Sequence, residues 1–408
     1  MNVTDIRSLF PALADTVYGK PLVYLDNAAT SQRPLSVVEK ASELALHANA
    51  NIHRAVHALA AQATDEVEST REFVRASLHA ASREEIVFTS GTTAGINLVA
   101  SSFGEAFVSE GDEIIVSAAE HHSNIVPWQL LCQRKKAVLK VLEIDENGEL
   151  LTERLENLIS QRTKIIAIAQ ISNVLGIENP AREIIRLAHL HGVPVLLDGA
   201  QGFVHRNVDV QDLDCDFYVF SGHKVYAATG TGVLYGKKRW LDAMPPFMGG
   251  GEMIETVRFS GTTFAPLPGK FEAGTQHFNG IPTLKPALEF RQKCLEDKDL
   301  MREQEAICSY VSEALLSDSR IRLYGVPRRT SDKIPLFSFT VEGAHHEDLA
   351  LILDKMGIAL RSGQMCAEPL MDHYGVTGML RASFAPYNTL EEAKYFIQCL
   401  HKAIDMLV

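Results

Sequence analysis

Residues 193–226 read VPVLLDGAQGFVHRNVDVQDLDCDFYVFSGHKVY and contain two short apolar runs, 193–200 and 217–222. Runs that are apolar at successive positions are typical of strands buried on both faces of a parallel sheet. The carboxyl ends of such strands meet at one edge, where open α/β sheets bind ligands. The polar residues at or just after these ends are Asp198, Ser221, His223 and Lys224. The stretch therefore predicts an α/β domain with a ligand site at this edge.

Further runs rich in β-branched residues flank this stretch and alternate with helical patterns. The other predicted strands are 85–90, 112–118, 137–144, 164–172 and 232–236. The predicted helices are 35–48, 54–80, 94–108, 123–136, 152–160 and 181–192. This alternation is typical of βαβ units. We therefore expect a large domain with a mostly parallel, seven-stranded sheet flanked by helices.

The pattern changes after residue 245, where Gly- and Pro-rich segments are typical of loops. One long helix is expected at 283–316. Beyond it, the predicted elements are strands at 335–342, 358–361 and 379–384 and helices at 345–356 and 389–406. These elements indicate a smaller α+β domain. We place the large domain at 20–275 and the small domain at 276–408 together with 1–19.

The 408 residues include 39 Lys and Arg against 51 Asp and Glu, a formal net charge of −12. This balance argues against nucleic acid as a partner, because phosphate neutralisation needs clustered Lys and Arg. Charged residues interrupt every apolar run before the ~20 residues that span a bilayer. The first segment has no basic stretch followed by an apolar core. We expect a cytoplasmic protein with no membrane segment, and the spacing of its six cysteines predicts neither disulfides nor a metal site.

The segment FTSGTTAGIN, residues 88–97, combines a strand, a glycine turn and the start of a helix. Free N–H groups at the helix start, with the hydroxyls of Thr92 and Thr93, suit a phosphate, although an ordinary helix cap fits the same pattern. Lys224 can form a Schiff base with an aldehyde and Asp198 can pair with a ring nitrogen, although a plain ion pair between them is also open. Phosphate, aldehyde and basic ring nitrogen together describe pyridoxal phosphate.

Three residues outside these strands carry further candidate chemistry. His121 or its neighbour His122 suits a flat stacking partner and proton carrier for a planar cofactor, which would make His121 a catalytic residue, or is an ordinary core or surface histidine. Cys366 lies in a polar turn with Arg361 nearby, and is either an inert thiol or a nucleophile. Arg381 interrupts an apolar run, and either forms an ion pair or binds a substrate carboxylate. The second interpretation of each suits an enzyme of amino-acid chemistry.

Motifs along the whole chain resemble those of the cysteine desulfurases, in the class-V aminotransferase group and fold type I of the pyridoxal-phosphate enzymes. The matching motifs are YLDNAAT (24–30), NIHRAVH (51–57), SGTTAGINLVA (90–100), AEHHSNIVPWQ (119–129), ISNVLG (171–176), DGAQG (198–202), FSGHKVY (220–226), FEAGT (271–275), RSGQMCAEPL (361–370) and GVTGMLRASFAPYNT (375–389). The last two are similar to the group II branch, which includes selenocysteine lyase-like and cysteine sulfinate desulfinase enzymes.

The resemblance implies a role for each matching residue. Lys224 holds the cofactor and removes the substrate α-proton, and Cys366 accepts the sulfur. The implied cofactor ligands are His121 stacked on the ring, Asp198 on the pyridine nitrogen, Gln201 on the ring hydroxyl, Thr93, Ser221 and His223 on the phosphate beside Thr92, and Thr275 on the phosphate of the neighbouring subunit in a homodimer. The implied substrate site includes Asn173, Arg381 and His53.

We therefore expect conversion of L-cysteine to L-alanine, with a persulfide on Cys366 that passes sulfur to a SufE-like acceptor. Because selenium and sulfinate leave without thiolate attack, a selenocysteine lyase or cysteine sulfinate desulfinase acting without Cys366 is an alternative. An ordinary class-V aminotransferase is another. A catalytically silent scaffold that binds a sulfur carrier belongs to a different class, and the intact Lys224 and Asp198 argue against it. Gln364 and Met365 stand where the family often has His-His or His-Tyr, which leaves substrate preference open.

Overall fold

The larger sheet of the computed structural model, which describes residues 3–408, has seven strands in the order β4-β10-β9-β8-β7-β5-β6. Neighbours from β6 to β9 are parallel, whereas β10 runs antiparallel to both β9 and β4. The strands are β4 (Ile86–Thr89), β5 (Glu113–Ser117), β6 (Val138–Leu142), β7 (Thr163–Ala169), β8 (Val195–Asp198), β9 (Phe217–Ser221) and β10 (Gly232–Gly236). This confirms the predicted mostly parallel, seven-stranded sheet.

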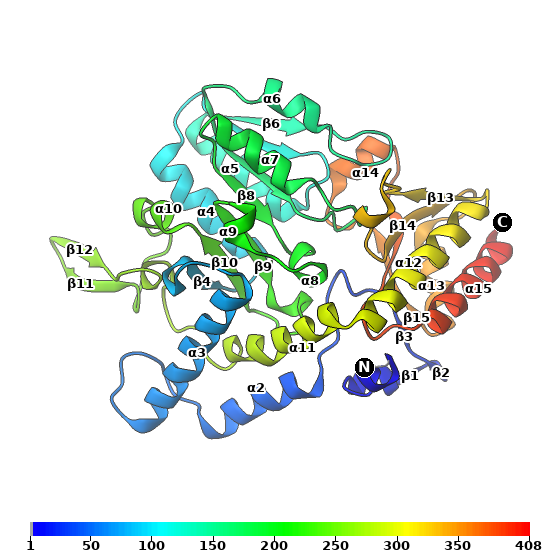
Figure 1. The fold of residues 1–408 in the computed structure, drawn as a ribbon, viewed down its shortest axis with the longest axis horizontal. Helices are drawn as coiled ribbons and strands as arrows, with labels where there is room; N and C mark the ends of the chain where they lie inside the picture. Colours follow the sequence, from blue (N-terminus) through cyan, green and yellow to red (C-terminus); the bar gives the residue numbers. More distant parts are fainter. Residues whose placement is uncertain (1–2) are drawn as a thin grey trace.

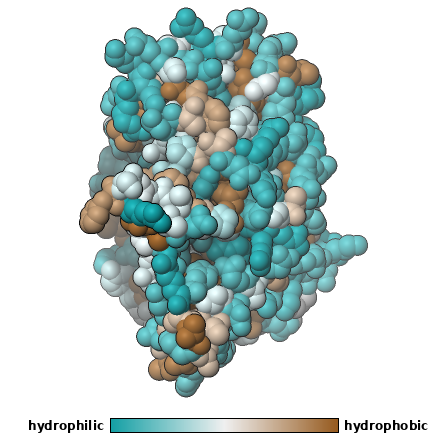
Figure 2. Space-filling model, turned by 90° about the vertical axis from the view of Figure 1, so that its left-hand side faces the viewer, coloured by the Kyte–Doolittle hydropathy of each residue, from teal (hydrophilic) through white to brown (hydrophobic). Residues whose placement is uncertain are grey.

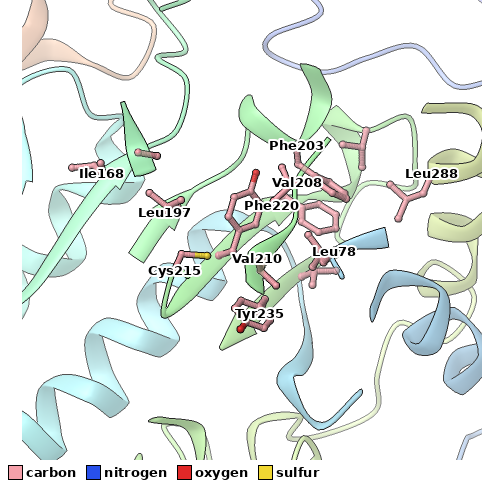
Figure 3. Packing of buried hydrophobic residues seen from close by; sticks show 14 of the residues in the cluster. Leu78, Ile168, Leu197, Phe203, Val208, Val210, Cys215, Phe220, Tyr235 and Leu288 are labelled. Atoms are coloured by element: carbon pink, nitrogen blue, oxygen red, sulfur yellow. The ribbon is translucent and has the colours of Figure 1, made fainter. Parts of the chain in front are cut away.

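The central strands are apolar throughout because both of their faces are covered. Along β7, Ile166 and Ile168 belong to one apolar cluster, whereas Ile165 and Ala167 belong to a second cluster on the opposite face. This alternation follows from the period of two of a strand. Figure 3 shows part of the first cluster, where Ile168 lies in the same layer as Leu197.

Helices cover both faces of this sheet (Figure 1). They are α2 (Leu35–His47), α3 (Ala58–Ser77), α4 (Thr92–Phe107), α5 (Val126–Lys135), α6 (Leu155–Leu158), α7 (Ala181–Leu190), α8 (Gly202–His205), α9 (Val210–Leu213) and α10 (Lys238–Ala243). The helix α4 packs against β9 and β10, so its N-terminus lies beside the end of β9. The helix expected at 152–160 is reduced to α6 and a preceding 3₁₀ turn, Thr152–Arg154.

The C-terminal part has a second, antiparallel sheet in the order β13-β14-β17-β16. Its elements are β13 (Ile321–Tyr324), β14 (Leu336–Val341), β16 (Arg361–Gly363), β17 (Met379–Ser383), α12 (Lys298–Ser317), α13 (His346–Lys355), α14 (Glu368–Tyr374) and α15 (Leu390–Leu407). A separate apolar core joins most of these elements, with Phe337, Leu380 and Phe396 fully buried in it. The structure thus confirms a smaller α+β unit beside the large sheet.

The single helix expected at 283–316 is wrong, since the structure has α11 (Leu284–Glu296) and α12 instead. The break lies at Asp297, whose carboxylate accepts hydrogen bonds from the N–H groups of Asp299 and Leu300. An aspartate that caps the N-terminus of a second helix ends the first one, although the apolar period continues through it.

The segment after residue 245 is not all loop. It contains a hairpin of β11 (Ile254–Arg258) and β12 (Gly261–Phe264), which projects from the large unit (Figure 1). Most of its residues are exposed, so no buried apolar face marks it in the sequence. Figure 2 shows the side of the molecule that bears the hairpin, where hydrophilic side chains predominate and apolar ones form small groups.

The domain boundaries at 275 and 19 stay predictions, and the packing gives them a context. Phe10 and Leu13 from the N-terminal segment, together with Leu284 of α11, belong to the apolar cluster of the large sheet. Val23 instead belongs to the core of the small unit, where β3 (Val23–Tyr24) pairs with β15 (Ile358–Ala359). Among residues 3–408, none of the helices has the length and apolarity needed to cross a bilayer.

Candidate active site

A cavity of about 200 Å³ opens at the carboxyl ends of β7, β8 and β9. The predicted site residues that line it are Thr92, Thr93, His121, Asn173, Asp198, Gln201, Ser221, His223, Lys224, Cys366 and Arg381. Residues that lie up to about 300 positions apart in sequence therefore meet in one space, at the edge predicted from the strand pattern. We call Asp198 and Lys224 the floor of this cavity, and Met365 and Cys366 its rim.

A larger groove, of about 940 Å³, lies along α7 and contains none of the predicted residues. Several of its charged side chains are paired with one another: Arg182 contacts Asp212 at 2.5 Å, and Arg206 contacts Glu178 at 2.6 Å. Size alone does not identify a reactive site, so the chemistry of the lining residues assigns the site to the smaller cavity.

Lys224 follows the end of β9 in a short 3₁₀ turn, Gly222–Lys224. Burial lowers the pKa of the Lys224 ammonium to about 8, although the nearby Asp198 charge opposes the shift. Asp198 ends β8, where one carboxylate oxygen accepts a hydrogen bond from the N–H of Ala200 at 2.9 Å, and burial raises the pKa of this carboxyl. Within residues 3–408 the Lys224 ammonium and the Asp198 carboxylate share no hydrogen bond or close ion pair. Each affects the pKa of the other only by its charge, which argues against the plain ion pair.

The start of α4 lines the cavity through Thr92 and Thr93. Gly91 precedes it with a φ of 146°, a left-handed conformation that favours glycine, and as the N-cap residue it has no side chain to cap the helix. The N–H and the hydroxyl of Thr92 both lie 2.8 Å from Ser221 Oγ. Burial lowers the pKa of His223 to about 4, so its ring is neutral near pH 7. Hydroxyls and N–H groups at a helix start suit an anion.

His121 follows β5 and lines the same cavity. Burial, assisted by the charge of Lys224, lowers the pKa of His121 to about 3. Its Nδ1 accepts a hydrogen bond from the N–H of Ser123 at 3.0 Å, which assigns the proton of the neutral ring to Nε2. The Ser123 hydroxyl also lies 2.7 Å from Thr93 Oγ1. Ser123 is thus a site residue that sequence reasoning missed, although it stands within the quoted AEHHSNIVPWQ motif.

The loop that carries His121 is held by Glu120, a fully buried carboxylate. It accepts hydrogen bonds from Ser117 Oγ at 2.5 Å, from Asn124 Nδ2 at 2.7 Å and from the N–H of Ala169 at 2.9 Å. Burial raises the pKa of this carboxyl to about 7. These contacts join the ends of β5 and β7 and fix the direction in which the loop leaves the sheet.

Cys366 reaches the cavity from the small unit and is exposed to solvent. The backbone of its loop is nevertheless anchored: the carbonyl of Cys366 accepts from the N–H of His122 at 2.7 Å, and that of Met365 accepts from Asn173 Nδ2 at 2.9 Å. Both Met365 and Cys366 have a φ of 54°, in the left-handed region that non-glycine residues rarely adopt. The loop thus presents the thiol in a strained turn pinned on both sides.

Among the described residues, Arg381 forms one of the two contacts that its sequence pattern left open, the ion pair, and keeps a donor free for the other. Its Nη2 lies 3.1 Å from Asp26 Oδ1, and its Nη1 donates to the backbone carbonyl of Asn173 at 2.9 Å. Its Nε is buried and, within residues 3–408, has no hydrogen-bond partner. A buried guanidinium with a donor left over is suited to a carboxylate ligand. Asp26, which lies in the YLDNAAT motif, and Arg361, which lines the cavity, were not among the predicted site residues.

Two predicted residues lie outside the cavity lining. The Nε2 of His53 lies 3.2 Å from a Glu68 carboxylate oxygen, and this contact raises the pKa of His53. Thr275 is exposed in the loop after the β11–β12 hairpin. Its expected contact with the phosphate of a partner subunit stays a prediction, as does the substrate role of His53.

The residues present fit pyridoxal phosphate. The start of α4, where the N-cap residue is a glycine, suits the phosphate, the neutral ring of His121 suits a flat partner, and the buried Asp198 suits a protonated ring nitrogen. Lys224 supplies the amine for the aldehyde. Gln201 lines the cavity and donates from Nε2 to the carbonyl of Ala28 at 2.9 Å, so its amide oxygen is available to accept. No metal-ligating cluster of His, Cys, Asp or Glu occurs in the described part of the chain.

Comparison with known proteins shows the family of this chain. A model of the class-V aminotransferases matches residues 23–396. The chain is 45% identical over 407 residues to a probable cysteine desulfurase of Vibrio cholerae, covering 100% of both chains. It is 46% identical over 407 residues to a cysteine desulfurase of Escherichia coli, covering 100% of this chain and 99% of the relative.

Two solved structures are similar over their whole length. The cysteine desulfurase CsdA of Escherichia coli has a TM-score of 0.90 at 40% identity, with 100% of both chains covered. The apo cysteine desulfurase of Thermococcus onnurineus has a TM-score of 0.90 at 35% identity, with 98% of this chain and 99% of that chain covered. The chain therefore belongs to the class-V aminotransferase family and, within it, to the group II cysteine desulfurases, as the resemblance of its motifs predicted.

Proposed function

We propose that this protein converts L-cysteine to L-alanine with pyridoxal phosphate and keeps the sulfur as a persulfide on Cys366. The observation that carries the proposal is the cavity shared by Lys224 and Cys366. Lys224 is half-buried on its floor, whereas Cys366 is the exposed one of the six cysteines. A group that moves protons and an accessible thiol thus face the same space, and relatives named cysteine desulfurases support the assignment.

Pyridoxal phosphate, when bound, supplies an electron sink for the α-carbon of an amino acid. Its proposed phosphate ligands are Thr92, Thr93, Ser221 and His223. Asp198 holds the proton of the ring nitrogen, and Gln201 accepts from the ring hydroxyl. Since Asp198 is buried, a cationic partner restores its carboxylate form and offsets the burial that raises its pKa.

Lys224 is the proposed proton carrier at the substrate α-carbon. Only its neutral amine takes a proton, and a pKa of about 8 leaves a usable neutral fraction near pH 7. His121 is neutral at this pH, so it stacks on a planar cofactor without repelling a cationic ring nitrogen. Arg381 binds the substrate carboxylate through its free Nε, and Asn173 lies beside it.

Sulfur transfer is assigned to the Cys366 thiolate. It attacks the substrate sulfur, so that an S–S bond forms while the substrate Cβ–S bond breaks. The electron pair of the broken bond goes to Cβ, which takes up a proton to become the methyl group of alanine. The balance is L-cysteine plus the Cys366 thiol giving L-alanine plus the Cys366 persulfide. The exposed position of Cys366 suits onward transfer to a second protein.

The remaining parts of the proposal concern partners and location. A SufE-like protein is the proposed acceptor of the persulfide sulfur. A homodimer is proposed because Thr275 is exposed and lies outside the cavity of its own chain, where it is free to reach that of a partner. The net charge of −12 supports neither nucleic acid nor an anionic membrane as a partner, and we place the protein in the cytoplasm.

The test is alanine release from L-cysteine under reducing conditions by the wild type and by Cys366→Ala. We expect release by the wild type and its loss, by at least ~10²-fold, in the variant, because the thiolate nucleophile is absent. L-cysteine sulfinate serves as the matched substrate, since its sulfur leaves without thiolate attack. Cys366→Ala is therefore expected to release alanine from cysteine sulfinate at close to the wild-type rate.

The alternatives give different results in the same assay. Equal release from L-cysteine by both proteins contradicts the role of Cys366. Activity on selenocysteine or cysteine sulfinate alone indicates a lyase or desulfinase, and transfer of the amino group to an added 2-oxo acid indicates an aminotransferase. A purified protein without cofactor absorbance and without any of these activities indicates the silent scaffold.

A further inference from the structure

Four consecutive backbone carbonyls, in the turn between β7 and α7, all accept hydrogen bonds from the C-terminal unit. The carbonyl of Asn173 accepts from Arg381 at 2.9 Å, and that of Val174 accepts from Ser338 Oγ at 2.6 Å. The carbonyl of Leu175 accepts from Lys333 Nζ at 2.6 Å, and that of Gly176 accepts from the N–H of Ile334 at 2.9 Å. The turn that leaves the large sheet is therefore held by hydrogen bonds from the small unit.

This turn sets the position of groups on the substrate side of the cavity. Asn173 lines the cavity, and its side-chain amide holds the carbonyl of Met365, directly before Cys366. Its carbonyl orients the guanidinium of Arg381. A displacement of the turn by a fraction of an ångström would move the proposed carboxylate ligands and the support of the cysteine loop together.

Among the four donors, Lys333 ties the turn to a second backbone carbonyl. Its Nζ donates to the carbonyl of Leu175 and also to that of Gly325, at 2.8 Å. A side chain at Gly325 would bring its Cβ to 2.3 Å from the Leu175 carbonyl oxygen, so the two backbone segments meet at close range. The ring centroid of Phe337 lies 5.5 Å from the ammonium.

Nothing in the proposed chemistry uses this buried amine. It is not among the residues that line the cavity, and burial lowers the pKa of its ammonium to about 7, with no carboxylate of the described chain opposing the shift. Desolvating an ammonium is unfavourable unless its donors are satisfied. Two carbonyls provide that satisfaction here, so the contact between the units depends on the length and shape of this side chain.

We infer that Lys333 is a positioning residue for the substrate-carboxylate site, acting through the Leu175 carbonyl on Asn173 and Arg381. The inference rests on the proposed function only in taking an α-amino acid as the ligand. Lys333→Met keeps the aliphatic volume and removes both hydrogen bonds. Loss of donors to buried carbonyls is expected to loosen the turn and to raise KM for L-cysteine about tenfold, with kcat within about threefold of the wild type.

The experiment compares Lys333→Met with Lys333→Arg and with a control, Lys238→Met, at an exposed lysine paired with Glu84. Hydrogen exchange of the peptide covering residues 171–177, in the full-length protein without substrate, is the structural readout. We expect faster exchange and a higher KM in Lys333→Met, recovery of at least half of both effects in Lys333→Arg, and no change in Lys238→Met.

A second variant, Ser338→Ala, removes the neighbouring donor to the Val174 carbonyl and keeps the inference testable if Lys333→Met does not fold. It is expected to raise KM and to speed hydrogen exchange by about two- to fivefold. Unchanged exchange at 171–177, or a fall in kcat and thermal stability at constant KM, overturns the inference. If the wild type releases no alanine from L-cysteine, the proposed function fails, whereas the exchange result still decides whether Lys333 holds the turn.

Discussion

At the floor of the cavity Asp198 is buried and Lys224 is half-buried, whereas at its rim Cys366 is exposed to solvent. Burial moves the pKa of both floor groups toward neutrality, which is what a group that carries protons near pH 7 needs. The rim instead offers a thiol on an anchored loop, which is what a sulfur carrier visited by another protein needs. The two halves of the proposed reaction are thus separated by their access to water.

The floor and the rim of the cavity are also built from different parts of the fold. The floor comes from neighbouring strand ends of one sheet, so its groups are placed by the pleat and register of β8 and β9. The rim comes from a loop of the other unit, placed by hydrogen bonds from His122 and Asn173 across the two units. Changes at the floor are therefore expected to affect every substrate, and changes at the rim only those whose sulfur needs a nucleophile.

The largest expected effect is that of Lys224→Ala. This variant removes the proposed proton carrier and is expected to lower kcat/KM by at least ~10²–10⁴-fold on L-cysteine and on cysteine sulfinate alike. Lys238→Ala, at an exposed lysine, is the control. Alanine release from both substrates is the measurement. Loss of activity on L-cysteine alone would break the division between floor and rim, because it would give Lys224 the selectivity expected of Cys366.

A smaller effect concerns the rate at which the apoprotein captures pyridoxal phosphate. Only the neutral amine of Lys224 attacks an aldehyde, so the rate is expected to rise about tenfold per pH unit below pH 8 and to level off above it. An exposed lysine, with its usual pKa near 10.4, would still show a rising rate at pH 9.5. Cofactor absorbance after mixing, from pH 6.5 to 9.5, measures the profile.

The matched control for this profile is Asp198→Asn. The carboxylate of Asp198 opposes the fall in the pKa of Lys224, so its removal is expected to move the midpoint below 8. A free alkylamine, reacted with the cofactor at the same pH values, corrects for the titration of the cofactor itself. A wild-type rate that keeps rising through pH 9.5 contradicts the assignment of a half-buried, tuned amine to the floor.

Much of the floor could be predicted from sequence, because strand ends in a parallel sheet converge. The apolar runs before Asp198 and Lys224 fixed their common edge, and the glycine turn before Thr92 indicated the helix start. The break at Asp297 could not be predicted from the apolar period, since a capping residue ends a helix without interrupting that period. The β11–β12 hairpin was not predicted because nearly all of it is exposed, so its strands show no buried apolar face.

The long-range hydrogen bonds between the two units could not be predicted from sequence. Nothing local to residues 173–176 indicates that their carbonyls bind Arg381, Ser338 and Lys333, which lie more than 150 residues away. Ser123 escaped because its contribution to His121 is a backbone N–H, which every residue except proline has. Residue types with distinctive chemistry are visible in a sequence, whereas backbone donors and acceptors become visible only in the fold.

The smallest expected effect concerns the proposed phosphate side of the cavity, at the hydroxyl pair of Thr93 and Ser123. Ser123→Ala removes one hydroxyl and leaves the N–H that orients His121, so the ring and its tautomer stay in place. A single hydrogen bond contributes ~0.5–1.5 kcal/mol, which predicts a two- to tenfold rise in the dissociation constant of pyridoxal phosphate. Equilibrium titration of the apoprotein measures it, with Ser317→Ala, at an exposed serine that ends α12 and does not line the cavity, as the control. Because the cofactor side is affected and the thiol is not, the ratio of activities on L-cysteine and cysteine sulfinate at saturating cofactor should stay constant; a change in that ratio would place Ser123 with the rim.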